Sequence, residues 1–174
     1  MKLDGRVWKY GDNIGATDMV SAKYDNHGMS REWDQCAKHL LEEIDARFVQ
    51  QVRPGDIIVG GHNLGAGHAH YYMAAIMGSA SAGVGALLGE SVNELFFRAA
   101  IDAGLTTWAY PNITEFVADG DRLEVDLVTG HATNHTQQKT TTFKPIPPLI
   151  LEILDAGGSE PWALQIVKQK ETVV

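Results

Sequence analysis

The sequence predicts one mixed α/β domain, and three observations carry that prediction. The chain has 174 residues, of which 44% are hydrophobic and 21% charged, so it is long enough to bury a core of its own. Its middle alternates short apolar runs with helical patterns, and its last third alternates polar and apolar residues between turns. We therefore expect a strand, a glycine-rich turn, a helix, a strand and a helix within one domain of residues 1–174, flanked by β-hairpins.

The first third predicts one strand and one helix. Residues 5–10 alternate as a strand does, and Gly11-Asp12-Asn13 is a turn. Residues 13–20 read as a loop, and residues 21–31 are polar and irregular. Ser30 is the expected N-cap of the following helix, in which Cys36 is expected to be a core or boundary residue. The apolar face of this helix comprises Trp33, Ala37, Leu40, Leu41 and Ile44.

The middle third has the clearest pattern. The turn at 53–56 contains Pro and Gly, and the continuous apolar run after it predicts a buried strand. A helix rich in Ala and Met follows the glycine-rich turn, and Gly104 ends a second helix. The predicted segments are a strand at 57–61, a turn at 62–67, a helix from 68 to about 80, a flexible segment at 81–85, a strand at 86–88 and a helix from 91 or 93 to 103.

The last third predicts strands, turns and one short helix. Leu123-Glu124-Val125-Asp126-Leu127-Val128 alternates cleanly after the turn at 119–121. Prolines 145, 147 and 148 precede an apolar helical segment that Gly157-Gly158 ends. The predicted segments are a strand at 107–110, a strand at 123–128, a further hairpin around Gly130 and Asn134, a helix at 149–156 and a weakly structured tail at 164–174.

Composition excludes several classes of protein. Net charge is −8, from 14 Lys and Arg against 22 Asp and Glu, which argues against nucleic-acid binding. No apolar run approaches the roughly 20 residues of a membrane span. The first residues lack the apolar region of a secretory signal, so we expect a cytoplasmic protein. Cys36 is the single cysteine, which excludes a disulfide framework and a cysteine-ligated metal cluster in this chain.

The glycine-rich turn 62–67 is the strongest local signal. A turn of this kind at the start of a helix exposes backbone N–H groups to an anion. The spacing Gly61-X3-Gly65-X-Gly67 matches neither a dinucleotide fingerprint nor a phosphate-binding P-loop. An anion site and a plain tight turn that packs a helix on a strand both remain open.

Histidines and carboxylates near this turn are the candidate chemical groups. His62, His68 and His70 allow either a metal site or proton transfer, because imidazole titrates near neutral pH. His68 and His70 point apart on a helix but converge on a loop. Tyr71-Tyr72 is expected to place one ring in the core and one partly in solvent. Three N-terminal carboxylates, whose spacing is not that of an EF-hand, are expected to be solvated. They are Asp12, Asp18 and Asp25.

A set of motifs in matching order over nearly the whole chain resembles a known family. It resembles the small subunit of 3-isopropylmalate dehydratase, the swivelling domain of the aconitase superfamily. The motifs are 5–14 (GRVWKYGDNI), Thr17-Asp18, 52–61 (VRPGDIIVGG), 63–67 (NLGAG), Ser91, 96–101 (FFRAAI), Gly104-Leu105, Gly120-Asp121, 123–127 (LEVDL), Gly130, Thr133-Asn134 and 149–158.

The resemblance implies a heteromeric hydro-lyase or isomerase. In that family the large subunit carries a [4Fe–4S] cluster whose open iron is a Lewis acid for the leaving hydroxyl. The small subunit closes the active site, binds substrate carboxylates and supplies a serine that moves the proton. No cofactor is then expected in this chain, and a large iron–sulfur subunit is its expected partner. Homo-oligomer formation by the isolated chain stays open.

The departures from the family fall on the reacting groups. Where the family has N-F-G-C-G-S-S-R-E-H, residues 63–72 are NLGAGHAHYY. The positions of the catalytic serine, the second serine and the substrate-binding arginine are therefore His68, Ala69 and His70. The family's S-F-A-R is SVNE at 91–94, so Glu94 replaces another arginine. Because loss of one partner of a buried ion pair costs about 2–5 kcal/mol, we do not expect isopropylmalate itself to be the substrate.

The first hypothesis is therefore a divergent small subunit that dehydrates or hydrates another small hydroxy acid. His68 is the expected acid or base, with His70 and Asp18 as its catalytic neighbours. The expected substrate-binding residues are Thr17, Lys23, Asn63, Gly65, Gly67 and Ala69.

Two alternatives remain at this point. One is a non-catalytic module that binds a small anion or regulates a partner from the same scaffold. The other is a metal enzyme that uses His62, His68 and His70.

Overall fold

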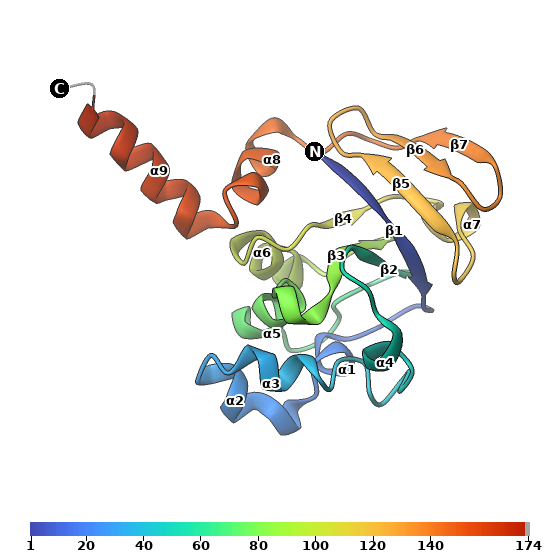
Figure 1. Ribbon diagram of the computed structural model, residues 1–174, viewed down its shortest axis with the longest axis horizontal. Helices are drawn as coiled ribbons and strands as arrows, with labels where there is room; N and C mark the ends of the chain where they lie inside the picture. Colours follow the sequence, from blue (N-terminus) through green and yellow to red (C-terminus); the bar gives the residue numbers. More distant parts are fainter. Residues whose placement is uncertain (173–174) are drawn as a thin grey trace.

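The seven strands found in residues 1–172, the part of the chain that the computed structural model describes, form one curled mixed sheet (Figure 1). Their order is β4-β3-β2-β1-β5-β6-β7. The strands are β1 Lys2–Lys9, β2 Asp56–Gly60, β3 Val84–Gly89, β4 Thr107–Ala109, β5 Arg122–Asp126, β6 His131–Asn134 and β7 Lys139–Thr142. The mixed α/β fold and the predicted strands are confirmed.

The first strand joins the two halves of the sheet. β1 pairs in parallel with β2, with Val7 opposite Ile57, and antiparallel with β5, with Leu3 opposite Val125. The half from β1 to β4 is parallel, and the half from β5 to β7 is antiparallel. All five residues of β2 are buried, as expected for a central strand in a parallel sheet.

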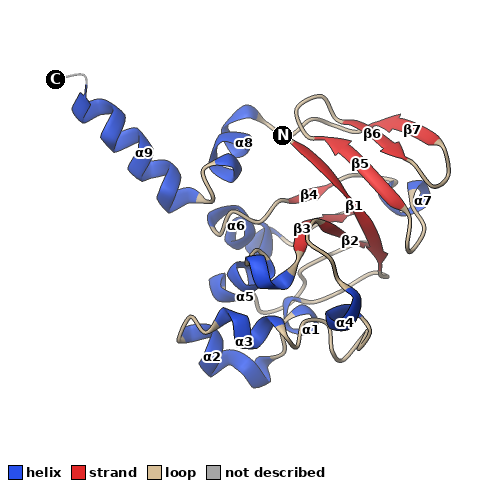
Figure 2. Cartoon of the chain, in the orientation of Figure 1, coloured by secondary structure: helices blue, strands red, loops and turns tan. Residues whose placement is uncertain are grey.

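Helices cover the parallel half of the sheet (Figure 2). The helices are α1 Ala16–Met19, η1 Ala22–Tyr24, α2 Asp25–Met29, α3 Trp33–Ala37, α4 Phe48–Gln51, α5 Tyr71–Met77, η2 Ala80–Ala82, α6 Glu94–Asp102, α7 Ile113–Phe116, α8 Pro148–Asp155 and α9 Ser159–Thr172. The side chain of Asn93 caps α6, because its oxygen accepts the N–H of Leu95 at 3.1 Å. Gly104 follows α6 at φ +76°, as expected of a helix-ending glycine.

Two buried clusters fill the two sides of the sheet. Alternate residues of a strand point to opposite faces, so Leu87 belongs to the cluster under α5 and α6, and Leu88 to the cluster shared with β5 and β6. Cys36 is buried in the first cluster, as predicted. No helix within residues 1–172 is both long and apolar enough to cross a membrane.

Four sequence predictions about helices are wrong. The helix expected after Ser30 covers only α3, and Ser30 ends α2 instead of capping α3. Three short elements, α1, η1 and α2, replace the loop predicted at 13–20 and the irregular segment predicted at 21–31. The helix expected from His68 begins at Tyr71.

The tail expected to be weakly structured at 164–174 is helical up to Thr172. Residues 173–174 of that prediction lie outside the described residues. α9 projects away from the sheet (Figure 1).

Candidate functional site

The glycine-rich turn lies where the loops after three parallel strands meet. The N–H of Asn13, after β1, donates to His62 O at 2.8 Å, and Gly65 N–H donates to Ile14 O at 2.7 Å. Leu64 N–H donates to the carbonyl of Ser91, after β3, at 3.0 Å. In open α/β sheets this carboxyl edge of the strands is where ligands bind.

Backbone conformation explains the glycines of the turn. Gly65 and Gly67 both have φ +79°, in the left-handed region that favours glycine. A Cβ on Gly65 would lie 2.6 Å from Cβ of Phe96 on α6, whereas a Cβ on Gly67 would meet nothing within 4 Å. Gly65 therefore brings the turn against α6, and Gly67 leaves an open surface before His68.

His68 and His70 lie on the extended segment between this turn and α5. The helix was expected to start at His68, but residues 68–70 separate it from the glycine-rich turn. On this segment the two side chains converge, with their Nε2 atoms 2.7 Å apart and their ring planes at 85°. Both histidines are exposed, so a ligand reaches them from solvent.

Tyr72, on α5, contacts His70 of this pair, and Asp25, on α2, contacts Tyr72. The His70 ring stacks on the Tyr72 ring at 5.1 Å between centroids and 17° between planes. The hydroxyl of Tyr72 donates to Oδ1 of Asp25 at 2.5 Å. Burial and then this carboxylate raise the pKa of Tyr72 above its usual value, so the phenol keeps its proton. Tyr72 is partly buried and Tyr71 exposed, so the expected core ring at this pair is not found.

The three N-terminal carboxylates all accept hydrogen bonds. Asp12 is exposed, as expected, whereas Asp18 and Asp25 are half-buried, so the expectation that these two are solvated is wrong. Asp12 accepts the N–H of His62 at 2.7 Å, and Asp18 accepts the N–H of Gly15 at 2.7 Å. Asp25 accepts from Tyr72, as described above. Asp12 and Asp18 thereby fix the loops around the glycine-rich turn, since Gly15 also pairs with Ala66.

The other expected substrate-binding residues have different surroundings. Lys23 is held in an exposed ion pair with Glu43 at 2.7 Å. The amide of Asn63 donates to Oδ1 of Asn13 at 3.1 Å, which joins the loops after β1 and β2. Thr17 is exposed on α1, and Ala69 is half-buried between the two histidines.

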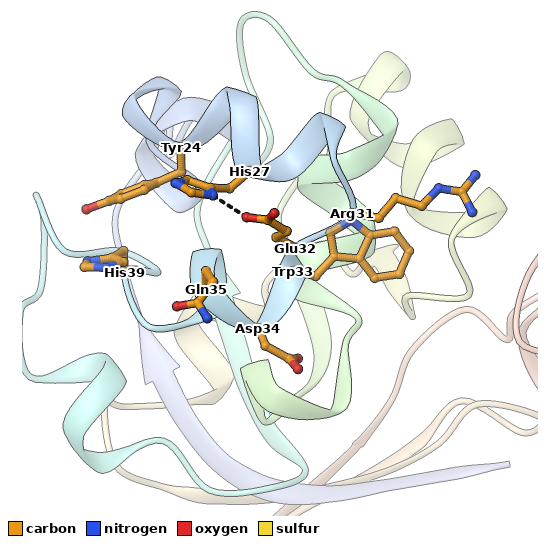
Figure 3. A pocket seen from close by; sticks show the side chains of 8 residues that line it. All are labelled: Tyr24, His27, Arg31, Glu32, Trp33, Asp34, Gln35 and His39. Carbon is orange, nitrogen blue, oxygen red and sulfur yellow. Dashed lines mark hydrogen bonds and ion pairs between the residues drawn. The ribbon is translucent and has the colours of Figure 1, made fainter.

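Two pockets share Arg31 and Trp33 in their linings, and one of them reaches the histidine pair. A pocket of about 300 Å³ opens on His70, and Arg31, Trp33 and Tyr72 also line it. A more polar pocket of about 600 Å³ lies between α2 and α3, and Figure 3 shows its His27–Glu32 hydrogen bond. In Figure 3 the Arg31 side chain points away from that bond, past Trp33.

Arg31 is the cation of the smaller pocket, and sequence reasoning missed it. Within residues 1–172 its guanidinium has no hydrogen-bond or ion-pair partner, whereas Arg47 and Arg122 are each paired with a carboxylate. Its φ of +60° is costly for an arginine. The segment 21–31 has no periodicity that would place Arg31, Asp25 or Gly28 at a site.

The metal-enzyme alternative requires His62 to join the other two histidines. His62 is exposed at the start of the glycine-rich turn, near Glu90. Among residues 1–172, no three His, Cys, Asp or Glu side chains are grouped as metal ligands. The chain's one cysteine, Cys36, is buried, and burial raises the pKa of its thiol. This donor set does not fit an iron–sulfur cluster, which needs several thiolates.

Comparison with known proteins gives consistent relatives over more than nine-tenths of the chain. No family model matches. A 3-isopropylmalate dehydratase small subunit from Thermodesulfovibrio yellowstonii is 36% identical over 162 residues, 93% of this chain and 94% of that protein. An isopropylmalate/citramalate isomerase small subunit from Methanocaldococcus jannaschii is 36% identical over 92% of both chains.

The fold agrees with a solved structure. The crystal structure of a 3-isopropylmalate dehydratase protein from Methanocaldococcus jannaschii superposes with a TM-score of 0.86. The two chains are 26% identical, and the match covers 98% of this chain and 99% of the other. With relatives above 30% identity over nine-tenths of its length, this chain belongs to the family of 3-isopropylmalate dehydratase small subunits.

Proposed function

We propose that this chain is the small subunit of a hydro-lyase or isomerase that acts on a small hydroxy acid together with a large iron–sulfur subunit. Its relatives are named as small subunits of dehydratases and isomerases. The chain itself has one buried cysteine, so the [4Fe–4S] cluster belongs to the large subunit. When bound there, the cluster supplies a Lewis acid for the leaving hydroxyl.

The observation that carries the proposal is the His68–His70 pair. It stands where the resemblance places a proton-transferring serine and a carboxylate-binding arginine. An imidazole in contact with a second imidazole keeps the capacity to take up and release a proton. Asp18 fixes the loop beside this pair through Gly15, and the backbone from Gly65 to Ala69 lines the approach to it.

The substrate that we propose has its carboxylates placed differently from those of isopropylmalate. His70, when neutral, offers no fixed charge where the family has arginine. Arg31 lines the pocket that opens on His70 and has its guanidinium free for one carboxylate. The charge of Glu94 does not repel this carboxylate strongly, because Glu94 is exposed and paired with Arg98. A hydroxy acid with one carboxylate near Arg31 fits this arrangement best.

Reconstitution with a large subunit tests the proposal. The chain is co-expressed with a candidate large subunit, and turnover of isopropylmalate, citramalate and hydroxy monocarboxylates is measured. We expect His68→Ala to lower kcat about 10²- to 10⁴-fold. Arg31→Gln is expected to raise KM for the best substrate about 30-fold or more, the fold-change of a lost charged contact.

The control is His131→Ala, which removes an exposed histidine of β6 away from the site and is expected to leave turnover unchanged. Unchanged turnover in His68→Ala would remove His68 from the mechanism. Equal turnover with and without this chain would favour the non-catalytic, anion-binding or regulatory alternative.

A further inference from the structure

A continuous series of contacts runs from α2 to His68. Asp25 accepts the hydroxyl of Tyr72, the Tyr72 ring stacks on His70, and His70 meets His68 through nitrogen. The backbone of Gly28 also lies against the Tyr72 ring, because a Cβ at Gly28 would overlap it. α2 therefore contacts Tyr72 at two points, its hydroxyl through Asp25 and its ring through Gly28. The fixed Tyr72 ring in turn orients the His70 ring that stacks on it.

The 2.7 Å contact between the two Nε2 atoms restricts the protons of the pair. A hydrogen bond between two imidazole nitrogens requires a hydrogen on one nitrogen and a lone pair on the other. The accepting ring must then carry its own proton on Nδ1 in both the neutral and the singly charged pair. The pair holds one proton between its rings, and a second one there would break the contact.

We propose that Tyr72, held by Asp25, is a positioning residue that keeps His70 in contact with His68, so that His70 receives the proton displaced when His68 acts as a base. This inference rests on the proposed catalytic role of His68. Because Nε2 of His68 faces His70, its Nδ1 is the nitrogen left for substrate.

The proton transfer balances within the pair. When Nδ1 of His68 takes a proton from a substrate carbon, the electron pair of the broken C–H bond stays on the substrate. The N–H bond at Nε2 of His68 then breaks, and a new one forms at Nε2 of His70. His70 already carries a proton on Nδ1, so it ends as an imidazolium and His68 ends neutral.

The environment of His70 suits a transient positive charge. The face of the Tyr72 ring lies 5.1 Å from the imidazole, within the range at which an aromatic ring stabilises a cation. The Asp25 carboxylate behind the phenol contributes a negative charge on the same side. Arg31, which lines the same pocket, opposes the charge on His70 unless a substrate carboxylate neutralises it. Proton transfer from His68 to His70 is thus favoured when substrate is bound.

Nitrogen NMR of the free chain tests this arrangement without any enzymatic assay. With 15N-labelled histidine at a pH where both rings are neutral, we expect His70 as the Nδ1–H form and His68 as the Nε2–H form. Tyr72→Leu is expected to return both rings to the tautomer mixture of a free histidine, and Tyr72→Phe to shift the spectrum part of the way. Tyr71→Phe is the matched control, since Tyr71 is exposed and is expected to leave the spectrum unchanged.

Two results would overturn the inference. One is a wild-type His70 in the Nε2–H form, which does not depend on whether any variant folds. The other is a folded Tyr72→Leu variant, judged by its amide spectrum, with wild-type histidine signals. In the active complex Tyr72→Leu should lower kcat about 10- to 100-fold, part of the usual acid–base contribution, with little change in KM. Absence of activity with every large subunit would contradict the proposed function only, because the tautomers are measured on the free chain.

Discussion

At the scale of single residues, buried polar side chains fix the conformation of the segments that connect the strands. Oδ2 of Asp121 accepts three hydrogen bonds, from Ala118 N–H at 2.8 Å, from Asn134 Nδ2 at 2.7 Å and from Gln137 Nε2 at 2.5 Å. Asp121 and Asn134 are both buried. One carboxylate therefore ties the segment before β5 to β6 and to the turn that follows it.

Asp121 predicts a specific pH dependence of stability. Its burial raises the pKa of the carboxyl, but the hydrogen bonds from Ala118, Asn134 and Gln137 outweigh burial and lower it below 3.8. A lowered folded-state pKa gives stability that is present above 3.8 and is lost as pH falls through the folded value. Asp121→Asn should lose about 1–3 kcal/mol of unfolding free energy at pH 7, and this difference from wild type should shrink below about pH 4.

Urea unfolding at a series of pH values measures this difference. Asp155→Asn serves as the control, because Asp155 is exposed on α8 and its replacement should change little at any pH. A difference between wild type and Asp121→Asn that stays constant down to pH 3 would contradict the argument.

The site residues divide into those that the sequence could predict and those that it could not. His68 and His70 stand out because the family that the sequence resembles has serine and arginine at these two positions. Arg31 and Asp25 do not stand out, since they reach the site only through the way α2 packs on α5 (Figure 1). A polar segment without periodicity gives no signal for such tertiary placement. The same packing explains why Asp25, expected in solvent, accepts a hydrogen bond from Tyr72.

At the scale of elements, the sequence placed strands better than helices. β2 and β3 are short apolar runs between glycines, a pattern that is typical of buried strands in a parallel sheet. The helices from α1 to α4 have only four or five residues each, too few for a 3.6-residue period to show. The sequence predicts a weakly structured tail at 164–174 where most of α9 lies, and the apolar residues of this helix do not form one clear face that would indicate it.

The turn before the histidine pair allows a matched pair of glycine substitutions. Gly65 and Gly67 have the same φ of +79°, so Ala at either position costs about 1–2 kcal/mol of backbone strain. Only Gly65 lies against Phe96, and overpacking there adds about 1–3 kcal/mol. Unfolding free energies should therefore fall by about 1–2 kcal/mol in Gly67→Ala and by about 2–5 kcal/mol in Gly65→Ala. Equal losses in the two variants would show that the turn does not pack on α6 as described.

At the scale of the whole molecule, the site is built on the parallel half of the sheet, and the antiparallel half completes the sheet and its core. The loops after β1, β2 and β3 meet at one edge, and α2 adds Asp25, Gly28 and the adjoining Arg31 from outside. The antiparallel strands β5 to β7 contribute none of the site residues named above, but they extend the sheet beyond β1. The two halves share β1 and are expected to unfold together.

A pair of adjacent leucines on β3 tests whether residues 1–174 fold as one cooperative domain. Leu87 and Leu88 are both fully buried, but Leu87 packs in the cluster under α5 and α6 and Leu88 in the cluster shared with β5 and β6. Each change to Ala should cost about 2–5 kcal/mol through lost contacts and a cavity. Because both clusters rest on the same strands, each variant should show a single urea transition that coincides by tryptophan fluorescence and far-ultraviolet circular dichroism. If Leu88→Ala instead gave an early transition in one probe while the other kept the wild-type midpoint, the antiparallel half would be an independent unit, and the single-domain prediction would be wrong.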